Sequence, residues 1–235
     1  IGPVYPAEQK EIASFVMEKK IPVVSPLSAS DEVSGDNPWF FQINPSREFI
    51  TARKTEYVVS AFKNSQMIVM QTGKSKEEAD AEVHMLRKEI ERSGQPGNTS
   101  VVKSVNYLED GYTGLRDALV KGQKNVIIIP SDKEAEVSIA VSNIKSLASS
   151  FDITLIGSNR FPQFESINPE SFHAGQLEFL TPYWPDYKNN EVTRSFVHKF
   201  RQYYKAEPNQ FSMQGYDVTF FFTKALSDFG KDFRD

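Results

Sequence analysis

Residues 67–90 read MIVMQTGKSKEEADAEVHMLRKEI, and the two ends of this stretch have different apolar patterns. Residues 67–70 form a continuous apolar run of strand length, whereas the later apolar residues recur at spacings of four, three and four, as on one face of a helix. Those later residues are Ala79, Val83, Leu86 and Ile90. Gly94 then favours the end of the helix. The stretch therefore predicts a buried strand followed by an amphipathic helix.

The same strand-and-helix unit recurs along the chain. Further mostly apolar segments predict strands at residues 21–24, 39–43, 101–105, 126–129, 153–156 and 177–180. Helical stripes are predicted near residues 12–19, 50–62, 115–119, 137–148, 192–203 and 218–229. Short strands joined by crossover helices place helices on both faces of a mostly parallel sheet. The predicted fold class is therefore α/β, with doubly wound sheets.

Composition excludes several classes of protein. The 235 residues carry 27 Lys and Arg against 31 Asp and Glu, so no basic field attracts a phosphate backbone and nucleic acid is not an expected partner. The chain contains no cysteine, which excludes disulfides and thiolate metal sites. No apolar run approaches the roughly 18 to 20 residues of a membrane span. We therefore predict no membrane span in this chain.

The motifs do not favour catalysis. Gly73-Lys74-Ser75 follows a predicted strand, but a P-loop needs a glycine five residues before Gly73, and Ile68 stands there. The three histidines lie far apart in the sequence without metal-ligand spacing, and no Gly-x-Ser-x-Gly elbow occurs. We expect neither an enzyme nor a bound metal or cofactor. A degenerate nucleotide hydrolase is the remaining enzymatic alternative.

Ligands of open α/β sheets bind beyond the carboxyl ends of the strands. The loops expected there are residues 5–8, 25–31, 72–76, 130–133 and 158–161. Several of them carry both hydroxyl and charged groups, as a small polar solute requires. The serines in these loops have two open interpretations, because each can either contact a ligand or cap the helix that follows.

Short motifs occur in a characteristic order along nearly the whole chain. They are IGP at 1–3, IPVVSPLS at 21–28, FQINPS at 41–46, IGS at 156–158, FVHKFRQYY at 196–204 followed by Pro208, and GYD at 215–217. This order resembles the type I periplasmic binding proteins, in particular the leucine/isoleucine/valine-binding branch of the ABC transporter substrate-binding proteins. The resemblance implies two Rossmann-like lobes with mostly parallel sheets, a ligand in the cleft between them and closure by a hinge.

The resemblance also implies a division of the chain. Lobe 1 is expected to comprise residues 1–45 and 183–235, and lobe 2 residues 46–182. Relatives begin with a further strand-helix-strand-helix portion of lobe 1 and finish with strands beyond the helix near Gly230. We therefore expect both ends of this sequence to lie inside a larger protein.

Ligand-binding residues follow from the same resemblance. Hydroxyl groups of two lobe 1 loops hold the ligand carboxylate in amino-acid-binding relatives, and an acidic residue of lobe 2 holds the amino group; that acidic position falls near Asn159. Arg160 and Lys74 favour an anionic group, whereas Asp132 is the nearby acid for an ammonium, so a polar ligand is expected over an aliphatic one. The candidate ligand-binding residues are Tyr5, Ser28, Ser30, Ser131, Asp132, Asn159 and Arg160.

Two functional hypotheses remain open. The first is a non-enzymatic, periplasmic or otherwise extracytoplasmic solute-binding domain, with a small-molecule ligand and a membrane permease as partner. The second is a protein-interaction module of the cell envelope that resembles the lipoprotein activators of peptidoglycan synthases, with a cell-wall enzyme as partner. Both hypotheses place the chain outside the cytoplasm, and the second makes it part of a lipoprotein.

Overall fold

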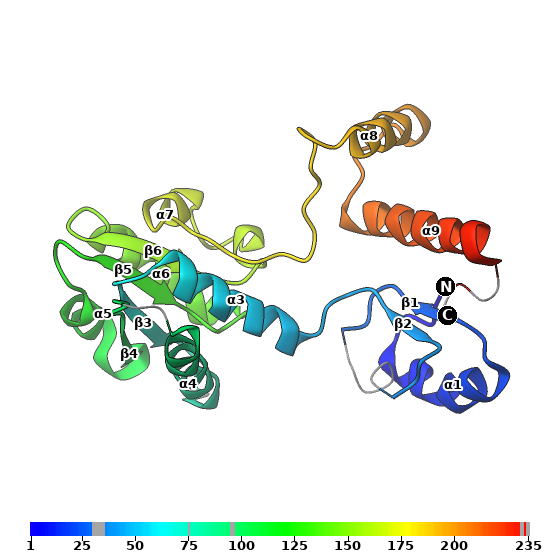
Figure 1. Ribbon diagram of the computed structural model, residues 1–235. Coiled ribbons are helices and arrows are strands. Elements are labelled where there is room, and N and C mark those ends of the chain that lie inside the picture. Colours follow the sequence, from blue (N-terminus) through cyan, green and yellow to red (C-terminus); the bar gives the residue numbers. More distant parts are fainter. Residues whose placement is uncertain (30–35, 75, 95–96, 231–232, 234–235) are drawn as a thin grey trace. The chain divides into compact units, whose positions relative to one another are not determined.

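The computed structural model describes residues 1–29, 36–74, 76–94, 97–230 and 233 (Figure 1). The chain divides into two compact units. We call residues 1–49 with 182–235 unit 1, and residues 50–181 unit 2.

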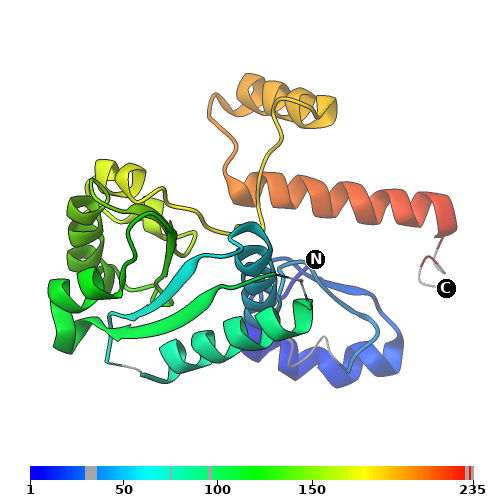
Figure 2. The same ribbon diagram turned by 60° about the vertical axis from the view of Figure 1, so that its left-hand side comes forward.

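Unit 2 is built on a four-stranded parallel sheet in the order β4-β3-β5-β6, whose strands are labelled in Figure 1 and turned by 60° in Figure 2. Its strands are β3 (Gln66–Gln71), β4 (Val101–Asn106), β5 (Lys124–Ile128) and β6 (Asp152–Ile156). Its helices are α3 (Arg47–Ala61), which begins in unit 1, α4 (Lys76–Ser93), α5 (Tyr107–Ala118), α6 (Glu134–Leu147), the short 3-10 helix η1 (Phe161–Gln163) and α7 (Pro169–Ala174). The predicted α/β class with parallel strands is confirmed.

Two apolar layers cover the sheet of unit 2, one on each face. Met67 and Val69 pack with residues of α3 and α4, whereas Ile68 and Met70 pack with residues of α5 and α6. All four side chains are fully buried. A strand buried on both faces needs apolar residues at consecutive positions, which is why β3 has a continuous apolar run and not an alternating one.

Unit 1 contains a shorter sheet. Its strands β1 (Val23–Ser25) and β2 (Phe40–Gln42) pair in parallel, and its helices are α1 (Pro6–Lys19), α8 (Glu191–Tyr204) and α9 (Gln210–Phe229). Asparagine side chains cap α8 and α9, because Asn190 accepts a hydrogen bond from the Thr193 N–H and Asn209 accepts one from the Ser212 N–H. The rings of Phe41 and Phe222 meet edge to face at 5.2 Å, so α9 packs against β2.

The predicted strand at residues 177–180 is wrong in extent. Pairing with β6 is limited to an isolated parallel bridge between Glu178 and Ile156. The Glu178 N–H donates to the Leu155 carbonyl oxygen, and the Glu178 carbonyl oxygen accepts from the Gly157 N–H. A turn in which Gln176 has a φ of 47° precedes this bridge, and strand pairing with β6 does not extend beyond it.

The predicted helix near residues 115–119 is longer than expected. It begins at Tyr107, after Asn106, whose side chain caps it, and it changes direction at Gly111. Gly111 has a φ of 56° and a ψ of −147°, a conformation that only glycine adopts readily.

Within the described part of the chain, no helix is both long and apolar enough to span a membrane.

Candidate functional site

The edge of unit 2 formed by the carboxyl ends of β3 and β5 is the first place to look for a ligand site. These strands are neighbours, but the chain continues from β3 to β4 on one side of the sheet and from β5 to β6 on the other. This reversal of strand order is a topological switch point, where open α/β sheets bind their ligands. The loops that follow β3 and β5 therefore supply the candidate residues.

A carboxylate is held at this switch point. Glu136 lies in the first turn of α6, and its Oε2 accepts a hydrogen bond from Ser131 Oγ at 2.7 Å. Lys133 Nζ lies 3.0 Å from Glu136 Oε1. Ser131 Oγ also accepts a hydrogen bond from the Lys133 N–H at 3.2 Å, which fixes the loop before α6.

The loop after β3 reaches the same carboxylate. A Cβ atom at Gly73 would overlap the carboxylate of Glu136, so the Gly73 backbone lies directly against it. The absence of a side chain at this position allows the contact. We call Thr72, Gly73, Ser131, Lys133 and Glu136 the switch-point cluster.

Thr72 is the member of the switch-point cluster whose side chain lacks a hydrogen-bond partner. Its side chain is buried, with only 3% of the residue exposed, and Oγ1 has no hydrogen-bond partner in the structure. A buried hydroxyl without a partner costs about 1–3 kcal/mol. Such a group in a folded protein needs an explanation, and a bound water or a polar ligand atom supplies one.

The electrostatics of the switch-point cluster favour a charged carboxylate. The hydrogen bond from Ser131, then that from Lys133, lower the pKa of Glu136 below its ordinary value. The neighbouring carboxylate conversely raises the pKa of Lys133. Both groups are therefore ionised at neutral pH, and the cluster offers one hydroxyl without a partner, one carboxylate and one exposed ammonium.

The predicted residues of unit 2 all follow carboxyl ends of its strands. Ser131 is a member of the switch-point cluster, and Asp132 is exposed beside it. Asn159 and Arg160 are exposed in the turn after β6, where the Arg160 N–H donates to Ser158 Oγ at 3.0 Å. The structure brings Ser131 together with Glu136, a residue that the sequence analysis did not select.

The predicted residues of unit 1 lie in loops near its two strands. Tyr5 is exposed and immediately precedes α1, and Ser28 is buried in the loop after β1. Ser30 lies outside the described residues, as does Ser75 of the Gly73-Lys74-Ser75 motif in unit 2. The structure gives Tyr5 and Ser28 positions but does not show them in contact with each other.

Amide side chains fix the loops at the carboxyl ends of β1 and β2. Gln214 Nε2, from α9, donates to the Pro26 carbonyl oxygen at 2.6 Å and to Asn44 Oδ1 at 2.7 Å. Asn44 Nδ2 in turn donates to the Leu27 carbonyl oxygen at 2.7 Å. The sequence analysis missed this framework, because isolated amides carry no periodic signal and their partners are distant in the sequence.

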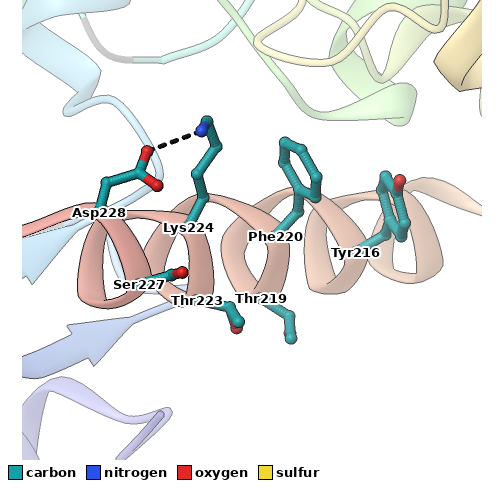
Figure 3. A pocket seen from close by; sticks show the side chains of 7 residues that line it. All are labelled: Tyr216, Thr219, Phe220, Thr223, Lys224, Ser227 and Asp228. Atoms are coloured by element: carbon teal, nitrogen blue, oxygen red, sulfur yellow. Dashed lines mark hydrogen bonds and ion pairs between the residues drawn. The ribbon is translucent and has the colours of Figure 1, made fainter.

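A groove on α9 is a weaker candidate. Its volume is about 510 Å³, and the side chains that line it all belong to this one helix (Figure 3). Lys224 and Asp228 form an ion pair of 2.6 Å within it. One helix face gives a ligand little enclosure, and ligand sites normally bury most of their ligand. Among the described residues, no group of His, Asp and Glu is placed to hold a metal ion.

Comparison with known proteins supports the predicted fold. No family model and no curated protein matches the sequence. A putative branched-chain amino acid ABC transporter protein from Rhodospirillum rubrum is similar in structure, with a TM-score of 0.63 and 17% identity over 94% of this chain and 63% of its own. The chain has the fold of type I periplasmic binding proteins.

Two further solved structures agree with this fold. An ABC transporter substrate-binding protein from Desulfitobacterium hafniense matches with a TM-score of 0.56 and 19% identity, over 96% of this chain and 63% of its own. A leucine-binding protein from Thermotoga maritima matches with a TM-score of 0.51 and 17% identity, over 97% of this chain and 63% of its own. The chain thus spans somewhat less than two thirds of the length of these periplasmic binding proteins.

Proposed function

We propose that this chain is part of an extracytoplasmic solute-binding protein that binds a small polar ligand without transforming it. The type I periplasmic binding fold supports this proposal, and so does the presence of hydroxyl and charged groups at the switch point. In this proposal, units 1 and 2 act as the two lobes, and a membrane permease of the ABC class is the partner. A Desulfitobacterium hafniense substrate-binding protein of the same fold was solved in complex with leucine.

The observation that carries the proposal is the hydroxyl of Thr72. It is buried without a partner in the residue that precedes Gly73, whose backbone lies against the carboxylate of Glu136, at the edge where this fold class takes its ligands. A core that served only stability would gain from valine at this position, because valine has the same shape without the desolvation cost. Retention of the hydroxyl fits a site that a ligand or water completes.

A ligand screen tests the proposal. Thermal unfolding of the 235-residue chain is followed with amino acids, short peptides and organic acids, and a true ligand at a hundredfold excess over its Kd adds about 2.7 kcal/mol of stability. Thr72→Val is expected to weaken the binding of that ligand, whereas Ser149→Ala, at an exposed position, is not. Failure of every compound to raise the Tm would contradict the proposal.

A second candidate function is supported by the aromatic surface of α8 and α9. The rings of Phe196 and Tyr216 meet at 4.4 Å between the two helices, tilted by 37° to each other, and Tyr203 of the same surface is 81% exposed. Large exposed apolar patches mark interaction sites. If the chain is a cell-envelope interaction module, Tyr203→Ser weakens its binding to a purified peptidoglycan synthase, measured by biolayer interferometry, and the ligand screen is negative.

A further inference from the structure

We propose that helix α8 is a membrane-docking surface, which holds unit 1 against a bilayer that contains anionic phospholipids. The proposal concerns unit 1 alone and does not depend on any ligand at the switch-point cluster of unit 2. It commits to a lipid surface, so binding of a peptidoglycan synthase at the same place is an alternative outcome of its test.

The charge of α8 and of the residues just before it is opposite to that of the whole chain. Residues 188–205 contain five lysines and arginines against one acidic residue, whereas the complete chain has a net charge of −4. The balance of charge over the whole chain conceals this local excess. An anionic surface attracts this stretch more than the rest of the chain, which favours approach with α8 foremost. Clusters of about four to eight basic residues on an amphipathic helix are typical of binding to anionic lipid.

Two of these lysines are available to an external anion. Lys199 and Lys205 are exposed, and neither forms an ion pair with any residue that the structure describes. Arg201, in contrast, is held by Glu207, with 2.8 Å from Nε to Oε1 and 2.9 Å from Nη2 to Oε2. That pairing neutralises Arg201 and leaves Lys199 and Lys205 as cations that lipid phosphates can contact.

Aromatic rings extend along α8 to its exposed end. The ring centroids of Phe200 and Tyr204 lie 4.5 Å apart, and those of Tyr204 and Tyr203 lie 4.9 Å apart. Tyr203 and Tyr204 are 81% and 62% exposed. Tyrosine combines an apolar ring with a polar hydroxyl, so it is favoured where hydrocarbon meets water at a membrane surface. The end of α8 therefore has the chemistry of an interfacial anchor.

An open groove brings the free cation and the rings together. Its volume is about 570 Å³, and all the side chains that line it belong to α8. A free solute on one helix face keeps much of its surface in water, which argues against a small-molecule site. A bilayer needs no enclosure, because the membrane itself covers the open side of the groove. The lining residues are Phe196, Lys199, Phe200, Gln202, Tyr203 and Tyr204.

The helix is already folded and fixed to unit 1 before any membrane is present. Phe196 meets Tyr216 of α9 at 4.4 Å, and Val197 is buried (α8 and α9 are labelled in Figure 1). Asn190 caps the start of α8. No segment has to become helical on binding, so docking does not carry the entropic cost of ordering a chain.

Vesicle co-sedimentation of the full 235-residue chain tests the proposal. The vesicles are either pure phosphatidylcholine or equal parts of phosphatidylcholine and phosphatidylglycerol. We expect binding to the anionic vesicles at low salt, little binding to the neutral ones, and loss of binding as salt rises, because ions screen exposed charges. Lys199→Gln/Lys205→Gln should weaken the binding about thirtyfold, since each basic residue near an anionic surface contributes roughly a factor of five.

Matched variants in unit 2 are the controls. Lys88→Gln/Lys121→Gln removes the same charge from two exposed lysines, and it should leave vesicle binding nearly unchanged. Tyr203→Ser removes the most exposed ring of α8 and should weaken binding to the anionic vesicles. Tyr112→Ser, at an exposed position of α5, should not.

The outcomes are clear-cut. Equal binding to both kinds of vesicle, binding to neither, or an equal loss in the α8 variant and the lysine control would overturn the proposal. Binding to a purified peptidoglycan synthase that Tyr203→Ser abolishes, without binding to vesicles, would overturn it in favour of a protein partner. Circular dichroism checks that each variant folds. If Lys199→Gln/Lys205→Gln does not fold, Lys199→Gln alone decides, because unchanged binding to the anionic vesicles contradicts the proposal.

Discussion

Lys54 Nζ lies 2.8 Å from Glu82 Oε2, in an ion pair that joins α3 to α4 below the surface of unit 2. The two side chains are only 17% and 4% exposed. Lys54→Met would leave the buried carboxylate without its partner, so the free energy of unfolding should fall by about 3 kcal/mol. Urea denaturation measures the change, and the double variant Lys54→Met/Glu82→Leu should recover most of it.

An exposed lysine provides the control for this prediction. Lys76 lies 4.0 Å from Asp80 on α4, with both side chains largely in water. Lys76→Met should change the free energy of unfolding by less than about 0.5 kcal/mol. Equal effects of Lys54→Met and Lys76→Met would show that burial adds nothing to the Lys54–Glu82 pair.

Asn125 holds the loop before β5 through its amide. Its Oδ1 accepts from the Val120 N–H at 2.8 Å, and its Nδ2 lies within hydrogen-bond distance of the carbonyl oxygens of Val120, Gln123 and Asp152. The residue is fully buried. Asn125→Ala would leave several backbone groups unsatisfied and should lower the free energy of unfolding by about 2–3 kcal/mol. Asn159→Ala, at an exposed position, should have almost no effect in the same denaturation experiment.

Gly157 is required where β6 ends, because a side chain has no room there. A Cβ atom would lie 2.5 Å from two ring carbons of Phe161 and 3.1 Å from Leu177 Cδ1. The Phe161 ring is fully buried and cannot move away freely. Gly157→Ala should therefore lower the free energy of unfolding by about 1–3 kcal/mol.

At Gly215, in contrast to Gly157, substitution of glycine by alanine is expected to raise the free energy of unfolding. It lies in α9, and no atom approaches within 4 Å of the position that a Cβ would take. Gly215→Ala should raise the free energy of unfolding by about 0.5–1 kcal/mol, because alanine loses less backbone entropy in a helix. A loss of stability at Gly215 similar to that at Gly157 would contradict the packing argument.

The sequence predicted the strands of unit 2 well, for a physical reason. β3 and β5 are buried on both faces, so their apolar runs are continuous and cannot be confused with a solvated loop. Residues 177–180 are also mostly apolar, with Glu178 among them, but they bridge β6 only at Glu178, because pairing depends on the turn before them and on the edge that β6 offers. The apolar content of residues 177–180 alone encodes neither that turn nor that sheet edge.

The switch-point cluster was only partly predictable. Ser131 was selected because it follows a strand, whereas Thr72 and Glu136 were not. Glu136 is an ordinary acidic residue of a helix first turn in the sequence, and its contact with Gly73 exists only because β3 and β5 are neighbours in the sheet. The order of strands decides which loops meet, and local sequence patterns do not contain that order.

The stability contributed by Glu136 should depend on pH with a defined sign. Ser131 and then Lys133 lower the pKa of Glu136 in the folded state. A group whose pKa is lower when folded stabilises the protein above its ordinary pKa, and this contribution is lost as the pH falls through the folded value. The difference in free energy of unfolding between the parent chain and Glu136→Gln should therefore be largest at neutral pH and shrink below about pH 4. Denaturant titrations across this range measure it, and a difference that stays constant or grows toward acid would mean that the Ser131–Glu136 hydrogen bond does not stabilise the folded carboxylate.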